Sequence, residues 1–339
     1  MIHLRVTTLL AAALLLASCG GDGGGNGGDG DGADQGSSSD GTRLFSISAV
    51  GDGITLVDLD QDEEEQFVEG LTEPHHLTLL NGSLWFAEGS YDLVWVDPGS
   101  GDEEGRAALP AHVSDLAVTD DTAWVISGII GGGETLVAVD LDEQSVRGSL
   151  MPPEGTRYDF VAASGDDVWV FGGDPMLATV ASRIDPVGVT QELTVDTGLI
   201  GDSMVIGAGA LWVGGTIPGA VPMSGLAKLD TATGAVIRLI ELGDPADHIT
   251  VATAFGHVWL TEGLKGILYK IDPETGEIIS QGSVGAGAAG IPLEILETED
   301  LIWIFNTTED EARGFDPETL EFESGIRVPP FASAPVFAP

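Results

Sequence analysis

The sequence predicts an all-β protein, a seven-bladed β-propeller, from a repeat of about 44 residues, one tryptophan in each repeat and a recurrent Asp-containing turn. Each repeat holds short apolar segments separated by Gly, Asp and Asn, the pattern of a four-stranded blade. Tryptophans recur at intervals of 39, 45, 43, 47 and 44 residues, at Trp85, Trp124, Trp169, Trp212, Trp259 and Trp303. Strand-ending aspartates recur at 39, 43, 45, 45, 42 and 44 residues, at Asp58, Asp97, Asp140, Asp185, Asp230, Asp272 and Asp316.

The turns that follow these aspartates explain why the aspartates recur. Asp272-Pro273-Glu274-Thr275-Gly276 is the clearest copy, and Asp230 to Gly234 has the same length. The Asp carboxylate accepts hydrogen bonds from backbone N–H groups further along the turn, Pro presets φ, and Gly supplies a positive φ. We therefore expect these aspartates to be structural, and the tryptophans to be wedges between blades.

The phase of the repeat predicts how the ring closes. Six complete blades begin with inner strands at residues 76–80, 114–118, 159–163, 203–206, 248–252 and 293–296. Three strands are left over near the start of the repeat region, at 44–49, 54–58 and 66–68, and one near its end, at 334–337. Together these four complete a seventh blade and remove the free sheet edges of a linear array. The predicted propeller domain is residues 43–339.

Residues 1–18 have the features of a secretory signal, with Arg5 followed by an apolar run from Val6 to Ala17. The segment Leu16-Ala17-Ser18-Cys19-Gly20 resembles the lipobox of bacterial lipoproteins. That resemblance implies lipidation at Cys19 and a bacterial cell membrane location on the extracytoplasmic side, at the cell surface or in the periplasm. Cys19 is the only cysteine, so no intrachain disulfide can form. Residues 19–42 comprise the lipidated Cys and a Gly/Asp/Ser-rich disordered tether.

The charge excludes one class of partner. Lys and Arg number 12 and Asp and Glu 55, which gives a net charge of −43. Nucleic-acid binding is not expected, because phosphate backbones are held by Lys and Arg. The expected partners are the membrane, through the lipid anchor, and a protein, glycan or small polar ligand. The chain is expected to be a monomer.

Three segments resemble bacterial propellers of the streptogramin lyase (Vgb) and surface-layer YVTN types. They are residues 84–88 (Leu-Trp-Phe-Ala-Glu), 258–262 (Val-Trp-Leu-Thr-Glu) and 268–276, which runs into the Asp272 turn. The resemblance implies the propeller fold. It also implies, for the lyases, a His general base and a magnesium-coordinating Glu on such strands, which open a ring by elimination.

Ligands of propellers bind at a mouth of the central channel, which the loops before each inner strand and after each second strand face. The expected ligand-binding residues at this place are His75, His76, Asp115, Tyr158, Asp159, Asp202, Ser203, Asp247, His248 and Glu294.

Two blades also pair an inner-strand His with a Glu three residues after the Trp. The pairs are His76 with Glu88 and His248 with Glu262, and they lie four blades apart. Imidazole and carboxylate together can carry a proton or bind a divalent cation. All four residues are therefore candidate catalytic residues, with Glu88 and Glu262 as candidate metal ligands. Two functions stay open: a binding scaffold with its ligand at the channel mouth, and a metal-assisted lyase (streptogramin-lyase-like elimination) or hydrolase at the same mouth.

Overall fold

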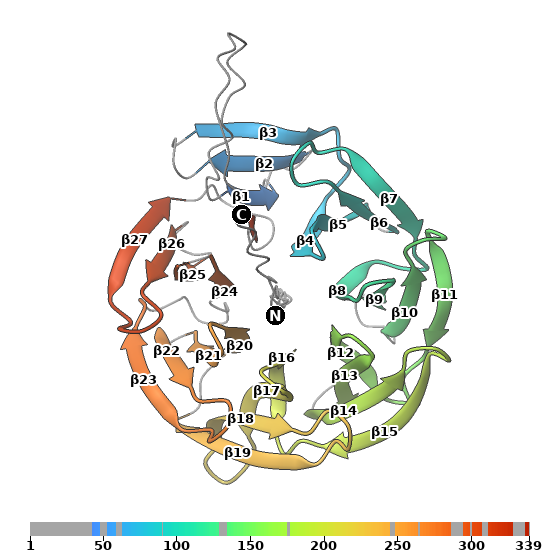
Figure 1. The fold of residues 1–339 in the computed structure, drawn as a ribbon. Helices are drawn as coiled ribbons and strands as arrows, with labels where there is room; N and C mark the ends of the chain where they lie inside the picture. The colour runs from blue at the N-terminus through green and yellow to red at the C-terminus, as the bar shows by residue number, and fades with distance from the viewer. Residues whose placement is uncertain are drawn as a thin grey trace, which may run out of the picture.

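The computed structural model describes residues 43–47, 53–58, 63–89, 91–128, 134–174, 177–244, 248–263, 265–285, 294–298, 300–306, 311–327 and 336–338. The predicted signal peptide, Cys19 and the tether lie outside these residues. Within them the chain forms seven four-stranded antiparallel sheets arranged as blades around a central axis (Figure 1). The prediction of a seven-bladed propeller is therefore confirmed. No described segment is a helix long and apolar enough to cross a bilayer.

Blades 1 to 3 are continuous in sequence. Blade 1 consists of β4 (His75–Leu80), β5 (Ser83–Glu88), β6 (Asp92–Val96) and β7 (Glu103–Ala108). Blade 2 consists of β8 (Val113–Val118), β9 (Thr122–Ser127), β10 (Thr135–Asp140) and β11 (Ser145–Leu150). Blade 3 consists of β12 (Arg157–Ser164), β13 (Asp167–Asp174), β14 (Leu177–Asp185) and β15 (Thr190–Asp196).

Blades 4 to 6 repeat this order from the axis outwards. Blade 4 consists of β16 (Ile200–Gly207), β17 (Ala210–Ile217), β18 (Met223–Leu229) and β19 (Val236–Gly243). Blade 5 consists of β20 (Ile249–Ala254), β21 (His257–Glu262), β22 (Ile267–Ile271) and β23 (Ile278–Ser283). Blade 6 consists of β24 (Glu294–Glu297), β25 (Ile302–Asn306), β26 (Glu311–Phe315) and β27 (Phe322–Arg327).

Blade 7 joins the two ends of the repeat region. Its sheet order is β28-β1-β2-β3, with β1 (Arg43–Ile47), β2 (Gly53–Asp58), β3 (Glu63–Glu69) and β28 (Val336–Ala338). The strand β28 pairs antiparallel with β1, with Ala338 opposite Arg43 and Val336 opposite Phe45. The predicted closing strand is thus confirmed, although it lies one to two residues later than the predicted 334–337.

The apolar core is divided between the blades. Each of the seven core clusters in the described part of the chain combines side chains from two consecutive blades, the last one joining blades 6 and 7. One repeated tryptophan lies in six of them, and all six indoles are at most 5% exposed. Three indole N–H groups donate to the hairpin between the first two strands, as Trp259 does to the Ala254 carbonyl at 2.9 Å. The tryptophans are wedges between blades, as predicted.

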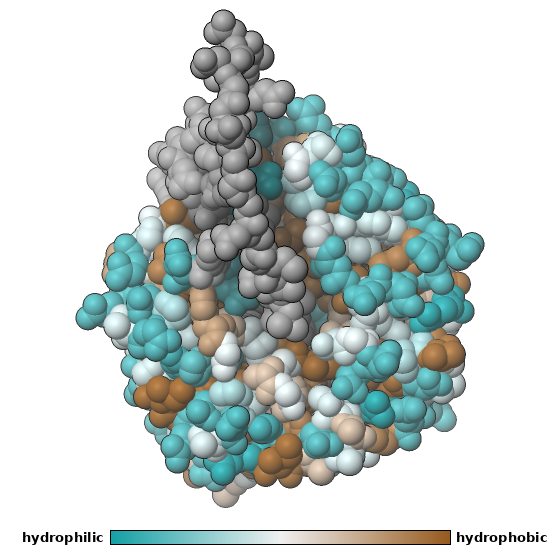
Figure 2. Space-filling view, in the orientation of Figure 1, coloured by the Kyte–Doolittle hydropathy of each residue, from teal (hydrophilic) through white to brown (hydrophobic). Residues whose placement is uncertain are grey.

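The repeated aspartates close the outer hairpins. The Asp272 carboxylate accepts the Thr275 N–H at 2.7 Å, and Asp230 and Asp316 accept the equivalent N–H at 2.7 and 2.6 Å. These bonds lower the pKa of each carboxyl, because they stabilise its charged form. The face of the ring seen in Figure 2 is largely hydrophilic, with hydrophobic residues scattered between charged ones.

Ring closure through β28 makes a first prediction. Deleting residues 336–339 should expose the inner edge of β1 and loosen both core clusters that flank blade 7. We expect a loss of about 3 kcal/mol in the free energy of unfolding, seen as a fall in Tm of roughly 6 °C or more by circular dichroism. Deleting residue 339 alone is the control and should leave Tm unchanged. Equal Tm values for the two deletions would contradict this role of β28.

Candidate functional site

The starts of the inner strands and the ends of the second strands lie at one end of the ring. His75, the first residue of β4, pairs with Ala87 next to the end of β5, and Ile249 of β20 pairs with Glu262. Because antiparallel partners place these ends side by side, His75, Glu262 and the other described residues at these strand ends lie at one end of the channel. We call this end the mouth.

β-Bulges mark the beginning of four consecutive inner strands. The register shifts between His75 and Thr78 in β4, and between Val113 and Asp115 in β8. It shifts again between Tyr158 and Phe160 in β12, and between Gly201 and Ser203 in β16. A bulge turns a side chain away from the regular alternation of a strand. The bulges therefore decide which of the predicted mouth residues face the channel and which face a neighbouring blade.

Three histidines gather at the mouth between blades 1 and 2. His75 and His76 belong to β4, and His112 immediately precedes β8. The ring centroid of His75 lies 5.2 Å from that of His76 and 5.3 Å from that of His112. The ring centroids of His76 and His112 are 6.3 Å apart. His112 was not predicted as a site residue. It lies two residues before the predicted start of the inner strand at 114, so a wider window would have included it.

The backbone of this histidine cluster is strained, and one ring nitrogen has no partner. His76 has φ of 55° and Glu73 has φ of 47°, values that are uncommon outside glycine. The His75 Nδ1 lies 3.0 Å from the Glu73 carbonyl oxygen. A carbonyl only accepts, so Nδ1 is the donor in this hydrogen bond. The Nε2 of the same ring is buried and has no hydrogen-bond partner among the described residues.

Two of the three histidines of this cluster are held in their uncharged form. Burial, with repulsion from the His75 and His112 rings, lowers the pKa of His76 to about 3. Burial and then His75 lower the pKa of His112 as well. The His75 and His112 rings are stacked with 24° between their planes, so their in-plane nitrogens do not aim at a shared centre. In the described part of the chain, no group of three His, Cys, Asp or Glu is arranged to hold a metal ion.

Glu88 is bound within its own blade. Its Oε2 lies 2.6 Å from Arg106 Nη1, and its Oε1 accepts the Thr72 N–H at 3.1 Å. Arg106 also contacts Asp92 and Glu103, so the guanidinium neutralises a small acidic group. Both carboxylate oxygens of Glu88 are thus used: Oε1 attaches the loop before β4 to the end of β5, and Oε2 binds Arg106 of the outer strand β7.

Glu262 occupies the same place in blade 5 and is held in the same way. It is completely buried, with Oε1 at 2.9 Å from Lys265 Nζ and Oε2 accepting the Tyr269 hydroxyl at 2.7 Å. Burial and the Glu262 charge raise the pKa of Tyr269. His248, half-buried, accepts the Gly263 N–H at its carbonyl at 3.0 Å. Both candidate metal-binding carboxylates are therefore already neutralised by a cation of the chain.

Asp115 and Ser203 connect neighbouring blades. Both are only 1% exposed. The Asp115 Oδ2 accepts the Val161 N–H of blade 3 at 2.7 Å, and the Ser203 hydroxyl accepts the Val251 N–H of blade 5 at 3.0 Å. Burial raises the pKa of Asp115 well above its ordinary value, although the Val161 and Leu116 N–H groups oppose that shift. The two side chains hold adjacent inner strands together.

The remaining predicted site residues do not form one group. Tyr158 is 4% exposed and packs in the apolar cluster between blades 2 and 3. Asp159 forms an ion pair with Arg157, with 2.7 Å between Oδ1 and Nε. Asp202 is half-buried, and burial raises its pKa to about 7 against the effect of the Ile249 N–H. Asp247 and the side chain of Glu294 lie outside the described residues.

No protein-family model matches the chain, and no curated protein matches it. Several solved structures are similar to the chain. A functionally unknown protein from Desulfotomaculum acetoxidans is similar with a TM-score of 0.67 and 10% identity, over 87% of this chain and 98% of that chain. BamB from Moraxella catarrhalis has a TM-score of 0.54 and 13% identity, over 84% and 87% of the two chains. Apo AztD from Citrobacter koseri has a TM-score of 0.53 and 12% identity, over 88% and 98%. At these identities the likeness shows the propeller fold.

The raised pKa of Asp202 predicts a pH-dependent stability. Between about pH 4 and pH 7 the folded protein holds a proton that the unfolded chain releases, so this group makes the fold less stable as the pH rises through that window. Asp202→Asn keeps an acceptor oxygen for the Ile249 N–H and cannot ionise. At pH 8 we therefore expect Asp202→Asn to raise Tm and to increase the free energy of unfolding by about 1–2 kcal/mol. This gain is smaller than the whole pKa shift would give, because Asp202 is partly exposed.

The same substitution should leave Tm unchanged near pH 3. Asp230→Asn is the matched control, because the Thr233 hydroxyl and N–H lower the pKa of Asp230. A lowered carboxyl pKa makes the ionised group stabilise the fold at high pH, so Asp230→Asn should lower Tm at pH 8. Thermal melts from pH 3 to pH 9 measure both effects, and a lower Tm for Asp202→Asn at pH 8 would contradict the prediction.

Proposed function

We propose that the protein is a membrane-anchored, extracytoplasmic binding scaffold that takes a small polar ligand at the channel mouth, beside His75, His76 and His112. The observation that carries the proposal is the histidine cluster itself. Strained φ angles at Glu73 and His76 are retained at a β-bulge, where they bring three imidazoles of two blades together. Such strain concentrates where a site needs a particular arrangement of groups.

The chemistry of the cluster indicates the class of ligand. Burial favours the uncharged form of His76 and His112 by lowering their pKa values, and the buried His75 Nε2 has no hydrogen-bond partner among the described residues. The surrounding domain is strongly acidic, since the 55 acids of the chain outnumber its 12 bases. An acidic field favours approach of neutral or cationic molecules over anions. The ligand we propose therefore donates N–H or O–H groups to imidazole and carries no negative charge.

Binding is favoured over the metal-assisted lyase or hydrolase by the state of the two glutamates. Glu88 is paired with Arg106, and Glu262 with Lys265 and Tyr269. A carboxylate that coordinates a divalent cation would have to give up these partners. For the fully buried Glu262, losing its cationic partner costs about 3–5 kcal/mol. Neither glutamate lies ready as a metal ligand.

Ligand retention is the direct test of the binding site. The full chain purified from its native envelope should carry a small molecule that is released on denaturation and detected by mass spectrometry. The double variant His75→Ala/His112→Ala should lose at least about 90% of it, since two of the three hydrogen-bonding rings are removed.

A control double variant, Val187→Ala/Phe322→Ala, changes two exposed side chains on the outer part of the ring, at 84% and 58% exposure. It should retain the ligand fully. If the histidine double variant and the control carry the same small-molecule content, the histidine cluster is not the binding site.

The lipid anchor has its own test. In a bacterial host, Cys19→Ser should remove the lipidated residue, so the protein should leave the membrane fraction and collect as unprocessed or soluble chain. Fractionation followed by immunoblotting measures this, with Ser37→Ala in the tether as control. Membrane retention of Cys19→Ser at the wild-type level would reject the anchor and leave the proposed binding site unaffected.

A further inference from the structure

The outermost strands of blades 1 to 6 share a β-bulge near their start. In β23 the bulge residue is Ile279, which lies between Ile278, opposite Ile271, and Ser280, opposite Lys270. The same register shift occurs in the other five blades. A bulge residue has no partner of its own in the neighbouring strand, and these strands form the circumference of the ring (Figure 1). In blade order the bulge residues are Glu104, Arg147, Glu192, Ile237, Ile279 and Glu323.

Blades 4 and 5 differ from the other four at this position. Their bulge residues are Ile237 and Ile279, which are apolar and 55% and 49% exposed, whereas the other four bulge residues are charged. The two blades also touch at the circumference, since a Cβ atom at Gly276, in the turn before β23, would lie 2.6 Å from Arg238 Cδ of β19. Figure 2 shows hydrophobic residues at the circumference where Figure 1 places β19 and β23.

The strand β23 is the only uncharged outermost strand in the described part of the chain. Its six residues are Ile, Ile, Ser, Gln, Gly and Ser, and each of the other six outermost strands has at least one charged side chain. Its outer edge has no neighbour in the sheet. Proteins protect such edges with charged side chains, because unpaired N–H and C=O groups can pair with another chain. That protection is missing from blade 5.

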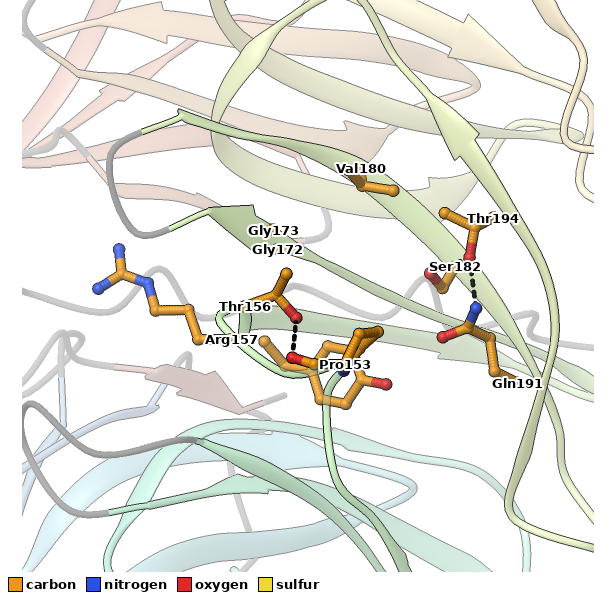
Figure 3. A pocket seen from close by; sticks show the side chains of 10 residues that line it. Pro153, Thr156, Arg157, Gly172, Gly173, Val180, Ser182, Gln191 and Thr194 are labelled. Atoms are coloured by element: carbon orange, nitrogen blue, oxygen red, sulfur yellow. Dashed lines mark hydrogen bonds between the residues drawn. The ribbon is translucent and has the colours of Figure 1, made fainter.

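Blade 3 shows how side chains are used along a charged edge. In β15 the bulge residue Glu192 forms an ion pair with Arg183 of β14, with 3.2 Å between Oε2 and Nη1. Gln191 Nε2 donates to the Thr194 hydroxyl at 2.6 Å, beside the small cavity of this blade (Figure 3). The polar side chains of β15 therefore bind within their own blade. With no charged residue, β23 forms no ion pair of this kind.

The charges next to β23 indicate the chemistry of a partner. Glu274 and Glu277, in the turn before the strand, are exposed, and neither forms an ion pair with the described residues. The whole chain has 55 acids and 12 bases, so a second copy is repelled and a basic segment is attracted. The edge therefore favours a partner that combines apolar side chains with Lys or Arg.

From this we infer that the outer edge of β23 binds an extended, basic and apolar segment of another protein, which adds to blade 5 as a fifth strand. Backbone hydrogen bonds would provide affinity, as in other cases of strand addition. The apolar side chains of the segment contact Ile278 and Ile279, and its Lys or Arg side chains pair with Glu274 and Glu277. This surface lies on an outermost strand, away from the histidine cluster on the inner strands, so either proposal can fail without the other.

The first test compares two peptides on the full wild-type chain. One is an eight-residue peptide of alternating Lys and Val, blocked at both ends. The other has the same sequence with every backbone N–H replaced by N-methyl, which keeps the charges and removes the backbone donors. We expect saturable 1:1 binding of the first peptide by isothermal titration calorimetry and at least about tenfold weaker binding of the second. No saturable binding of the first peptide, or equal affinity of the two, would overturn strand addition.

Variants test whether β23 is the edge that binds. Ile278→Lys removes an apolar contact and adds a charge of the same sign as the peptide, so it should weaken binding at least about fivefold. Val146→Lys is the matched control, because Val146 has the same register position in blade 2 and is 40% exposed, against 39% for Ile278. It should leave the affinity unchanged within about twofold. Equal affinities of the two variants would reject β23 as the site.

Amide hydrogen exchange locates the added strand. Binding of the unmethylated peptide should slow exchange in residues 278–283 and leave residues 145–150 of β11 unchanged. Slower exchange in other outermost strands but not in β23 would contradict the proposal. Analytical ultracentrifugation of the chain without peptide should show no dimer that Ile278→Lys abolishes. Such a dimer would make a second copy the occupant of this edge and overturn the assignment to a basic partner.

Discussion

The pairing of a three-residue strand, β28, with β1 is the contact on which the rest of the ring depends. Every core cluster in the described residues takes its side chains from two consecutive blades, so no blade has a complete core of its own. Closure allows blade 7 to complete the clusters on both of its sides, with Phe45 facing blade 1 and Leu44 facing blade 6. The free energy of the whole ring is thus coupled to one short sheet edge, as expected for repeats that contact only their neighbours.

The inner ring shows how a propeller divides its polar residues between structure and ligand. Asp115 and Ser203 each accept a backbone N–H from the next blade, and the mouth glutamates secure loops of their own blades. What is left over is the histidine cluster, in which burial favours the uncharged form of His76 and His112, in a strongly acidic molecule. Uncharged imidazoles are suited to holding a ligand by hydrogen bonds, because each has one donor and one acceptor nitrogen.

The candidate site could be predicted only in part. The repeat phase placed His75, His76, Glu88 and Glu262 at one end of the channel, and the strand pairing sets the strand ends that carry them side by side. The sequence pattern paired His76 with Glu88. In the structure His76 lies beside His75 and His112, and Glu88 forms an ion pair with Arg106. That partner lies 18 residues further along the chain, on the outer strand β7. A pattern of inner-strand residues contains no information about which outer-strand cation reaches the mouth.

The sequence by itself determined the number of blades, the closing strand, the structural tryptophans and the turn aspartates. All of these follow from spacing, because a blade of four strands and its turns needs a nearly constant length of chain and the same residue types at the same steps. Only the tertiary structure decided which polar side chains remain free. The bulges at His76 and Asp159 depend on how neighbouring strands pair, and the Val161 N–H reaches Asp115 across 46 residues of chain. Those contacts depend on how the strands pair in three dimensions, which the spacing of residues along the chain does not indicate.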